Sequence, residues 1–333
     1  MFNVRRREFI TLLGSGAVTW PLAAAGPGVA QQPTKIARVG ILTPAATEAT
    51  LAFQAFRKGI RDLGYVEGQT IVLDFRFARG NLDALPSLAA ELVRIPVDVI
   101  VTDSTNGTVA AFGATRTIPI VMATTSGDPV ALGVATSIAR PGGNVTGMLF
   151  RSFELSGRRL QLLKVAVPAT ARVTVLFNPK SAIGPPGQRV TEDAAKLLGL
   201  AVAPLAVGSP DELRALTPAV LTGSEGLTVV NDAMYWNNRA TILALASAAR
   251  IPAIYPEREY ADDGGLITYG ANVPDHFLQA AGYVDRILRG AKPGDLPINQ
   301  STKLDFVVNL RTARALGFAL SPDFISAANE VIE

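Results

Sequence analysis

Short apolar runs alternate with segments of helical periodicity along most of the chain, beginning near Lys35. The runs are rich in Val, Ile and Leu and are bounded by turn-forming residues, a pattern typical of buried strands. In the first half of the chain they predict strands at residues 37–42, 71–77, 97–101 and 118–122. Apolar residues three or four positions apart predict helices at residues 53–63, 85–92 and 129–139.

The same alternation starts again after a turn-rich stretch at residues 140–144, which could carry the chain into a second lobe. Further strands are predicted at residues 173–177, 201–205, 227–230 and 251–254, and further helices at residues 155–165, 188–198, 211–221 and 238–249. Such alternation produces a parallel sheet with helices on both faces. Two runs of about 110–120 residues each favour two lobes over one large sheet. The sequence therefore predicts an α/β protein with two doubly wound parallel-sheet lobes and a ligand cleft between them.

Polar residues collect directly after the predicted strands. In parallel α/β sheets, ligands bind beyond the carboxyl ends of the strands, where helix N-termini also suit anionic groups. Each such residue could instead be a helix cap. Clusters from both halves at the same end of the sheets nevertheless favour a shared site. The clusters are Thr43–Pro44, residues 102–106, residues 124–128, Asn178 and Asn231–Asp232.

The first thirty residues have the order of an export signal. Arg6 and Arg7 precede a mildly apolar run at residues 12–18, and small residues follow at positions 28–30, where a signal peptidase would cleave. The arginine pair indicates the twin-arginine route. We therefore expect residues 1–30 to be removed and the mature chain to begin near Gln31 in the periplasm.

The charge and composition of the chain limit the classes of partner that it can bind. Without residues 1–30, the excess of basic over acidic residues falls from three to one, so the chain lacks the basic field that a nucleic acid requires. It has no cysteine and one histidine, His276, which excludes disulfides, thiolate metal sites, a lipid-acceptor cysteine and histidine-rich metal sites. We expect no metal, no cofactor and no nucleic-acid partner, and a freely diffusing monomer.

Enzyme motifs are missing. No Gly-x-Gly-x-x-Gly or Gly-x-x-x-x-Gly-Lys-Ser/Thr sequence is present, so nucleotide cofactors lack their binding loop. The Gly-x-Ser-x-Gly elbow is absent too, and His276 has no evident serine partner. His276 begins a predicted helix, where solvated or capping histidines are common. These observations favour a binding protein with no catalytic residues, while a hydrolase and a ligand-sensing adaptor remain as alternatives.

Several segments resemble the bacterial ABC-transporter substrate-binding family of tryptophan/tyrosine-type importers. The most specific is Arg140-Pro141-Gly142-Gly143-Asn144-Val145-Thr146-Gly147. The others are residues 118–121, 127–133, 251–255, 264–270, 283–293 and 329–333. The resemblance covers nearly all of the chain after the signal.

This resemblance implies the type I periplasmic-binding-protein fold, with two lobes, several crossovers and a hinge. It implies a first lobe at residues 35–147, to which a helix at about residues 273–290 returns. It implies a second lobe at residues 148–270, on which residues from about 304 to 333 pack. Where relatives often have Asp-Pro after a strand, this chain has Asn231-Asp232-Ala233, so its ligand can differ from theirs.

The resemblance also implies a function. A receptor of this family captures a small carboxylate-bearing ligand by lobe closure and delivers it to a permease and its ATPase. An aromatic or other amino acid and an aromatic acid would all suit such a cleft.

In that interpretation hydroxyls and backbone N–H groups hold the carboxylate, and either Asp128 or Asp232 binds an amino or hydroxyl group, although both could cap helices. Tyr255, Tyr269, Tyr235 and Trp236 could supply aromatic walls of the cleft. The predicted ligand-binding residues are Thr43, Pro44, Ser104, Thr105, Thr125, Ser126, Asp128, Asn178, Asp232, Tyr255 and Tyr269.

Overall fold

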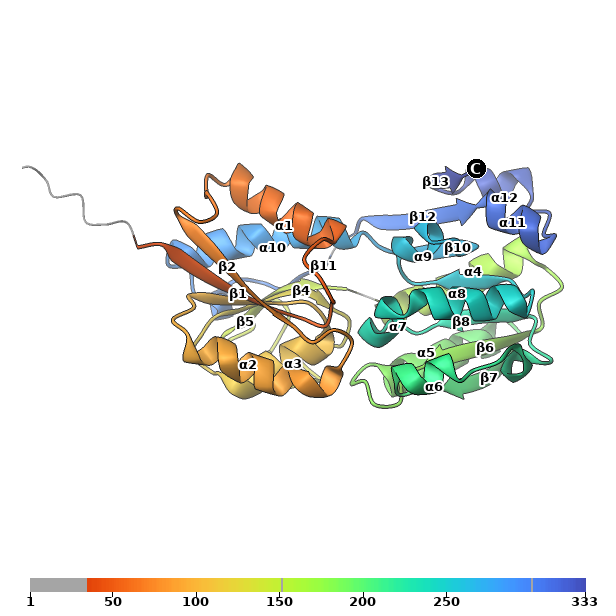
Figure 1. Cartoon of the computed structure of the whole chain (residues 1–333), viewed down its shortest axis with the longest axis horizontal. Coiled ribbons are helices and arrows are strands. Elements are labelled where there is room, and N and C mark those ends of the chain that lie inside the picture. The colour runs from red at the N-terminus through yellow and green to blue at the C-terminus, as the bar shows by residue number, and fades with distance from the viewer. Residues whose placement is uncertain (1–34, 151, 301) are drawn as a thin grey trace, which may run out of the picture. The chain divides into compact units, whose positions relative to one another are not determined.

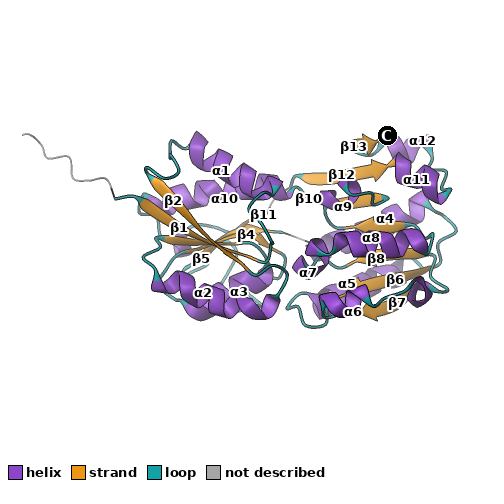
Figure 2. Ribbon diagram, viewed as in Figure 1, coloured by secondary structure: helices purple, strands orange, loops and turns teal. Residues whose placement is uncertain are grey.

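The computed structural model describes residues 35–150, 152–300 and 302–333. The predicted export signal lies outside the described residues. Residues 36–333 form one unit, whose strands belong to two sheets with helices packed on them (Figure 1). Figure 2 shows the strands of both sheets and the helices that lie against them. We call the first sheet with its helices the first lobe, and the other sheet with its helices the second lobe.

In the first lobe all neighbouring strands are parallel, in the order β11-β5-β4-β3-β1-β2. The strands are β1 (Ala37–Thr43), β2 (Ile71–Phe77), β3 (Val99–Thr102), β4 (Ile120–Thr125), β5 (Val145–Leu149) and β11 (Asn299–Gln300). The helices are α1 (Leu51–Asp62), α2 (Leu85–Arg94), α3 (Thr105–Ala114) and α10 (Val273–Leu288), with 3-10 turns η1 (Leu82–Ala84) and η3 (Pro293–Asp295).

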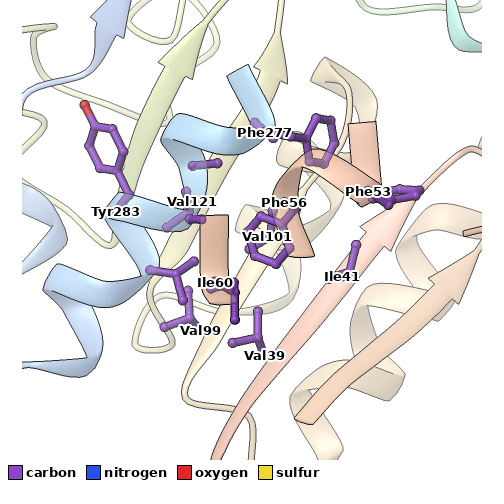
Figure 3. Packing of buried hydrophobic residues seen from close by; sticks show 14 of the residues in the cluster. Val39, Ile41, Phe53, Phe56, Ile60, Val99, Val101, Val121, Phe277 and Tyr283 are labelled. Atoms are coloured by element: carbon purple, nitrogen blue, oxygen red, sulfur yellow. The ribbon is translucent and has the colours of Figure 1, made fainter. Parts of the chain in front are cut away.

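Both faces of this sheet are buried. On one face Ile41 of β1 packs with Phe53 and Phe56 of α1 and with Phe277 of α10 (Figure 3). The rings of Phe53 and Phe277 meet edge to face, with 5.2 Å between their centroids. On the other face Leu42, the next residue of β1, belongs to the cluster beneath α2 and α3. Burial on both faces explains why these strands are continuous apolar runs in the sequence.

The second lobe has the strand order β13-β12-β10-β9-β8-β6-β7, in which only β12 and β10 pair in antiparallel fashion among the described strands. The strands are β6 (Arg172–Phe177), β7 (Ala201–Ala206), β8 (Gly226–Val229), β9 (Ala253–Tyr255), β10 (Ile267–Ala271), β12 (Leu304–Asn309) and β13 (Glu330–Ile332). The helices are α4 (Ser152–Ala166), α5 (Gly184–Leu197), α6 (Pro210–Arg214), α7 (Ala233–Asn237), α8 (Arg239–Ala248), α9 (Arg258–Asp262), α11 (Leu310–Leu316) and α12 (Pro322–Ser326), with a 3-10 turn η2 (Pro218–Leu221). The predicted fold class, two doubly wound α/β lobes, is confirmed. In the described ranges no helix is both long and apolar enough to cross a membrane.

The chain passes between the lobes at three places within the described ranges: between β5 and α4, between β10 and α10, and between β11 and β12. The prediction that residues 140–144 carry the first passage is wrong. The Asn144 side chain donates hydrogen bonds to the carbonyls of Thr115 and Ile118, at 3.3 and 2.7 Å. This turn therefore belongs to the connection between β4 and β5 inside the first lobe.

Two predicted helices are also wrong. Only residues 129–133 form a turn, and residues 134–139 are irregular, because Gly133 adopts a left-handed backbone (φ 70°) and Val134 N–H bonds back to the Pro129 carbonyl. The helix predicted at residues 211–221 is broken into α6 and η2, since Pro218 has no N–H for a continuing helix.

The left-handed turn end at Gly133 gives a stability prediction. We expect Gly133→Ala to lower the free energy of unfolding by about 1 kcal/mol, because an L side chain is strained at this φ. No heavy atom lies within 4 Å of the added Cβ, so crowding does not contribute. Denaturant unfolding measures the effect. The matched control is Gly113→Ala inside α3, where the Cβ is also unobstructed and the change should be neutral or stabilising by up to ~1 kcal/mol. Equal effects at both positions would contradict the backbone explanation.

Candidate functional site

A cavity lies between the two lobes, at the carboxyl ends of β1, β3 and β4 in the first lobe and of β8 and β9 in the second. The first lobe and its passages line it with Pro44, Ala45, Thr50, Ala52, Asp103, Ser104, Thr105, Asn106, Thr124, Ser126, Phe150 and Val273. The second lobe lines it with Ser181, Ile183, Asn231, Asp232, Ala233, Trp236, Asn237, Glu257 and Glu259. The space open to the centre of a water molecule is about 80 Å³, and on that scale one water needs about 10–15 Å³. The cavity therefore suits one small molecule.

Hydroxyl groups surround the N-terminus of α3. Ser104, whose backbone has a positive φ of 106°, caps the helix by accepting a hydrogen bond from Gly107 N–H at 3.1 Å. Thr105 Oγ1 accepts from the N–H groups of Ser126 and Gly127, at 3.0 and 3.2 Å. Each hydroxyl uses its oxygen as an acceptor in these bonds and keeps its own proton for donation. Together with the helix N-terminus, they form a region that suits a carboxylate.

Asp103 follows β3 and is held by two threonines. Thr43 Oγ1 and Thr124 Oγ1 donate to its two carboxylate oxygens, at 2.8 and 2.7 Å. Burial raises the pKa of Asp103, and these two hydrogen bonds oppose the rise. Thr43 is fully buried behind the cavity wall, so it positions Asp103 rather than facing the cavity.

Asp232 is the corresponding carboxylate of the second lobe, just after β8. It caps α7 by accepting from Met234 N–H at 2.8 Å, and the Asn178 amide donates to both of its oxygens at 3.3 Å. Burial raises the pKa of Asp232, while the donors from Asn178, Ser181 and the α7 backbone favour its charged form. Asn178 does not line the cavity; it orients Asp232.

Two more carboxyl groups follow β9. The Asn231 amide donates to Glu257 Oε1 at 2.5 Å. Burial and the neighbouring Glu259 carboxylate raise the pKa of Glu257 to about 8. Burial also raises the pKa of Glu259. Arg239 favours the charged form of both glutamates, but it pairs with Asp263 at 2.7 Å and does not line the cavity.

The lobes are joined across the cavity by two asparagines. Asn106 of α3 donates to Ser181 Oγ at 3.3 Å and accepts from Ala182 N–H at 3.2 Å. Asn237 of α7 donates to the Pro44 carbonyl at 3.1 Å. Each bond links one lobe to the other, so the structure represents a closed arrangement of the cavity.

A buried arginine lies next to the passages between the lobes. Arg159 of α4 donates to the carbonyls of Ser152 and Tyr269, at 2.9 and 3.2 Å. Burial lowers the pKa of its guanidinium to about 10, opposed by attraction to Glu257. Arg159 therefore fixes the start of α4 to β10, close to where each connects to the first lobe.

The structure brings together some of the predicted site residues. Pro44, Ser104, Thr105, Ser126 and Asp232 line the cavity. Thr43 and Asn178 lie directly behind it as supports, as described above. Thr125 is buried one layer deeper, with its hydroxyl 2.8 Å from that of Thr108.

Three predicted residues lie elsewhere. Asp128 is exposed and accepts from Val130 N–H at 2.9 Å, as a cap of the single turn described above. The ring of Tyr255 stacks on that of Tyr260 with 4.7 Å between centroids, in the core of the second lobe. The ring of Tyr269 meets Phe306 edge to face at 6.0 Å. None of the three lines the cavity.

The prediction that His276 is a solvated or capping residue is wrong. It is fully buried, and its Nδ1 lies 3.2 Å from the Ala123 carbonyl oxygen. Its ring packs edge to face on Phe150 with 5.7 Å between centroids, and burial lowers its pKa. His276 therefore supports the cavity wall from behind in its neutral form.

Sequence reasoning missed Asp103, Asn106, Asn237, Glu257, Glu259 and Phe150. The signal for Asp103 was present, because it lies inside the polar cluster at residues 102–106. The rule that ligands bind beyond strand ends could also have found Glu257, two residues after β9. Asn106 lies in the same cluster, but neither its contact with Ser181 nor the contact of Asn237 with Pro44 had a signal in the sequence.

A two-lobed α/β fold with a small polar cavity between its lobes defines the class of bilobed ligand-binding proteins. The family model described as "ABC transporter substrate binding protein" matches residues 38–332. The chain belongs to this family, which is one of substrate-binding proteins rather than of enzymes.

Similarity to individual proteins agrees with this assignment. The chain is 26% identical over 265 residues to a Clostridioides difficile protein named "Tyrosine-binding protein". The aligned region covers 80% of this chain and 76% of the relative. It matches the structure of an ABC domain in complex with L-Trp from Streptococcus pneumoniae with a TM-score of 0.82 and 22% identity, over 89% of this chain and 99% of the other. It matches a conserved domain protein from Vibrio cholerae with a TM-score of 0.83 and 25% identity, over 89% and 100%.

Proposed function

We propose that this protein is the periplasmic receptor of an ABC importer and that its ligand is an amino acid. In this proposal residues 1–30 direct export, the lobes close around the ligand, and the closed form delivers it to a permease that works with an ATPase. The observation that carries the proposal is that two capped helix N-termini line the first-lobe wall, while three of the four carboxyl groups of the cavity line the second-lobe wall.

The first-lobe wall suits a carboxylate. Thr50 and Ser104 cap the N-termini of α1 and α3 and both line the cavity. Helix N-termini favour anions, and the hydroxyls of Ser104 and Thr105 keep protons to donate. The second-lobe wall suits an ammonium group, because Asp232, Glu257 and Glu259 all line it. A zwitterionic amino acid would thus contact both lobes and favour the closed form.

An aromatic acid without an amino group fits less well. Its carboxylate would enter a cavity lined by four carboxyl groups, and no Lys, Arg or His occurs among the described lining residues. The names of the relatives support the amino-acid class, since one is called a tyrosine-binding protein and another was solved with L-Trp.

Asp232 is the best candidate for the α-ammonium group of the ligand. Its hydrogen-bond donors from Asn178 and the α7 backbone favour the charged carboxylate and fix its direction. It is 5% exposed, so an ammonium group beside it would be largely shielded from water, where charge-assisted hydrogen bonds are strongest.

A thermal-shift series on the purified protein tests this proposal. The series contains the L-amino acids, benzoate as an aromatic acid, and simple amines. A ligand at about 100 times its dissociation constant adds about 2.7 kcal/mol of stability, a shift of a few degrees for a protein of this size. We expect shifts with L-amino acids and none with benzoate. Shifts with benzoate alone would overturn the amino-acid assignment.

The asparagine contacts between the lobes give a prediction about closure. We expect Asn106→Ala and Asn237→Ala each to weaken ligand binding about 3- to 10-fold, because one or two hydrogen bonds of about 1 kcal/mol each are lost from the closed form only. Isothermal titration calorimetry measures the affinity, and small-angle scattering of the ligand-free variants should indicate a more open average. The control is Asn329→Ala, which removes a hydrogen bond from Phe306 N–H at 2.8 Å within the second lobe and does not line the cavity. Unchanged affinity in both variants would contradict a closing role.

A further inference from the structure

We propose that the ligand carries a second cationic group, which Glu257 and Glu259 bind, so that the preferred substrates are dibasic amino acids. This inference rests on the proposed function and specifies its substrate class. It starts from the number and position of the carboxyl groups in the cavity.

The cavity contains more acid than a zwitterion can neutralise. A single α-ammonium group pairs with one carboxylate, and Asp232 supplies it with fixed geometry. Glu257 and Glu259 remain, and they come from a different segment, the start of α9. Asp103 adds a further carboxyl group from the first lobe.

Glu257 is also incompletely satisfied. Asn231 donates to its Oε1, while no donor among the described residues reaches Oε2. Two basic side chains behind the cavity act on Glu257, and both have other partners. Arg239 pairs with Asp263 and lies over the Trp236 ring, with 4.6 Å from its guanidinium carbon to the ring centroid. Arg159 donates to the carbonyls of Ser152 and Tyr269. Without a paired cation, ionising this half-buried carboxyl group carries a desolvation cost, so it holds a proton at neutral pH. A cation supplied by the ligand would remove this cost.

The aromatic residues of the cavity are compatible with a basic side chain. Trp236 and Phe150 both line the cavity. Aromatic rings favour the methylene groups of a lysine-like or arginine-like chain and attract its cationic end. The second-lobe wall therefore offers an apolar surface that leads to acid groups.

Calorimetric titration of the purified protein with matched pairs of amino acids tests the inference. The pairs are L-lysine with L-norleucine and L-arginine with L-citrulline, which differ in charge at nearly constant shape; L-tryptophan and L-tyrosine are included. We expect the cationic member of each pair to bind at least 10-fold more tightly than the neutral one. Equal or tighter binding of the neutral members or of the aromatic amino acids overturns this inference and leaves the proposed function standing. Absence of binding by every amino acid overturns both.

Variants locate the origin of the preference. Glu257→Gln and Glu259→Gln should each reduce the ratio of lysine to norleucine affinity by about 10-fold, because each removes one carboxylate. The matched control is Asp193→Asn on the exposed surface of α5, which makes the same change in charge outside the cavity and should leave the ratio unchanged. A ratio that persists in both glutamine variants, or that falls equally in the control, contradicts recognition by Glu257 and Glu259.

Discussion

Replacing Asp232 by asparagine is expected to weaken amino-acid binding by about 100-fold or more. The substitution removes the charge that faces the ligand ammonium group, and loss of one partner of a buried, hydrogen-bonded charge pair costs about 2–5 kcal/mol. At ~1.4 kcal/mol for each tenfold change, the middle of that range exceeds a factor of 100. Calorimetric titration of the wild-type protein and the variant measures the effect.

The choice of asparagine separates binding from folding. In the Asp232→Asn variant the amide oxygen of the new side chain could still accept from Met234 N–H and cap α7, since asparagine is as good a cap as aspartate. The ligand-free melting temperature should therefore stay close to that of the wild-type protein. If affinity for every amino acid were unchanged while the fold was intact, the ammonium group would not be bound at Asp232.

Affinity for a cationic ligand is expected to rise with pH by up to tenfold per unit between about pH 6 and pH 8 and then to level off. In the ligand-free protein, burial and Glu259 raise the pKa of Glu257 to about 8, so Glu257 holds a proton at neutral pH. A cation beside it lowers this pKa, and binding below pH 8 therefore releases a proton. The other groups that act on Glu257 are Asp103, Glu259 and Asn231 around the cavity and Arg159, Arg239 and Tyr260 behind it.

Calorimetry at several pH values, in buffers of different ionisation heat, measures both the affinity and the released proton. Glu257→Gln should remove most of the pH dependence. The same raised pKa predicts that the ligand-free protein loses stability as pH rises from the ordinary glutamate value of 4.5 towards 8, because the folded state binds the proton more tightly than the unfolded state. A wild-type affinity that is flat or falls over this range would contradict the assignment.

The sequence predicted the fold class because both sheets are covered on both faces. Strands buried in this way are continuous apolar runs, and Ile41 with Leu42 illustrates how adjacent residues of one strand enter opposite cores. Periodicity in the sequence could not predict that α10 returns to the first lobe. This helix packs beside α1, although the two are more than 200 residues apart in the chain. That placement came from the family resemblance alone.

The site was predictable where it follows directly from strand ends. Ser104, Thr105 and Asp232 begin the helices that follow β3 and β8, and all line the cavity. The aromatic residues show the limit of this rule. Tyr255 is the last residue of β9 and still pairs with Thr268 of β10, so its side chain enters a core layer, whereas Glu257 lies beyond the strand end and reaches the cavity.

Contacts between the lobes could not be predicted from local patterns. Asn106 and Ser181 are 75 positions apart, and Asn237 and Pro44 are 193 positions apart. Their bonds depend on how the two lobes face each other, which neither periodicity nor strand-end chemistry specifies. The same holds for the acidic character of the cavity, which results from residues of three separate segments: Asp103, Asp232, and Glu257 with Glu259.

The central claim is that an amino acid binds between the lobes and leaves unchanged. Calorimetric titration of the purified protein with the full set of L-amino acids, followed by recovery and analysis of the added compound, tests it most directly. We predict saturable binding of at least one amino acid at one site per chain, with complete recovery of the compound. Absence of binding across the set, or conversion of the amino acid into a product, would contradict the account.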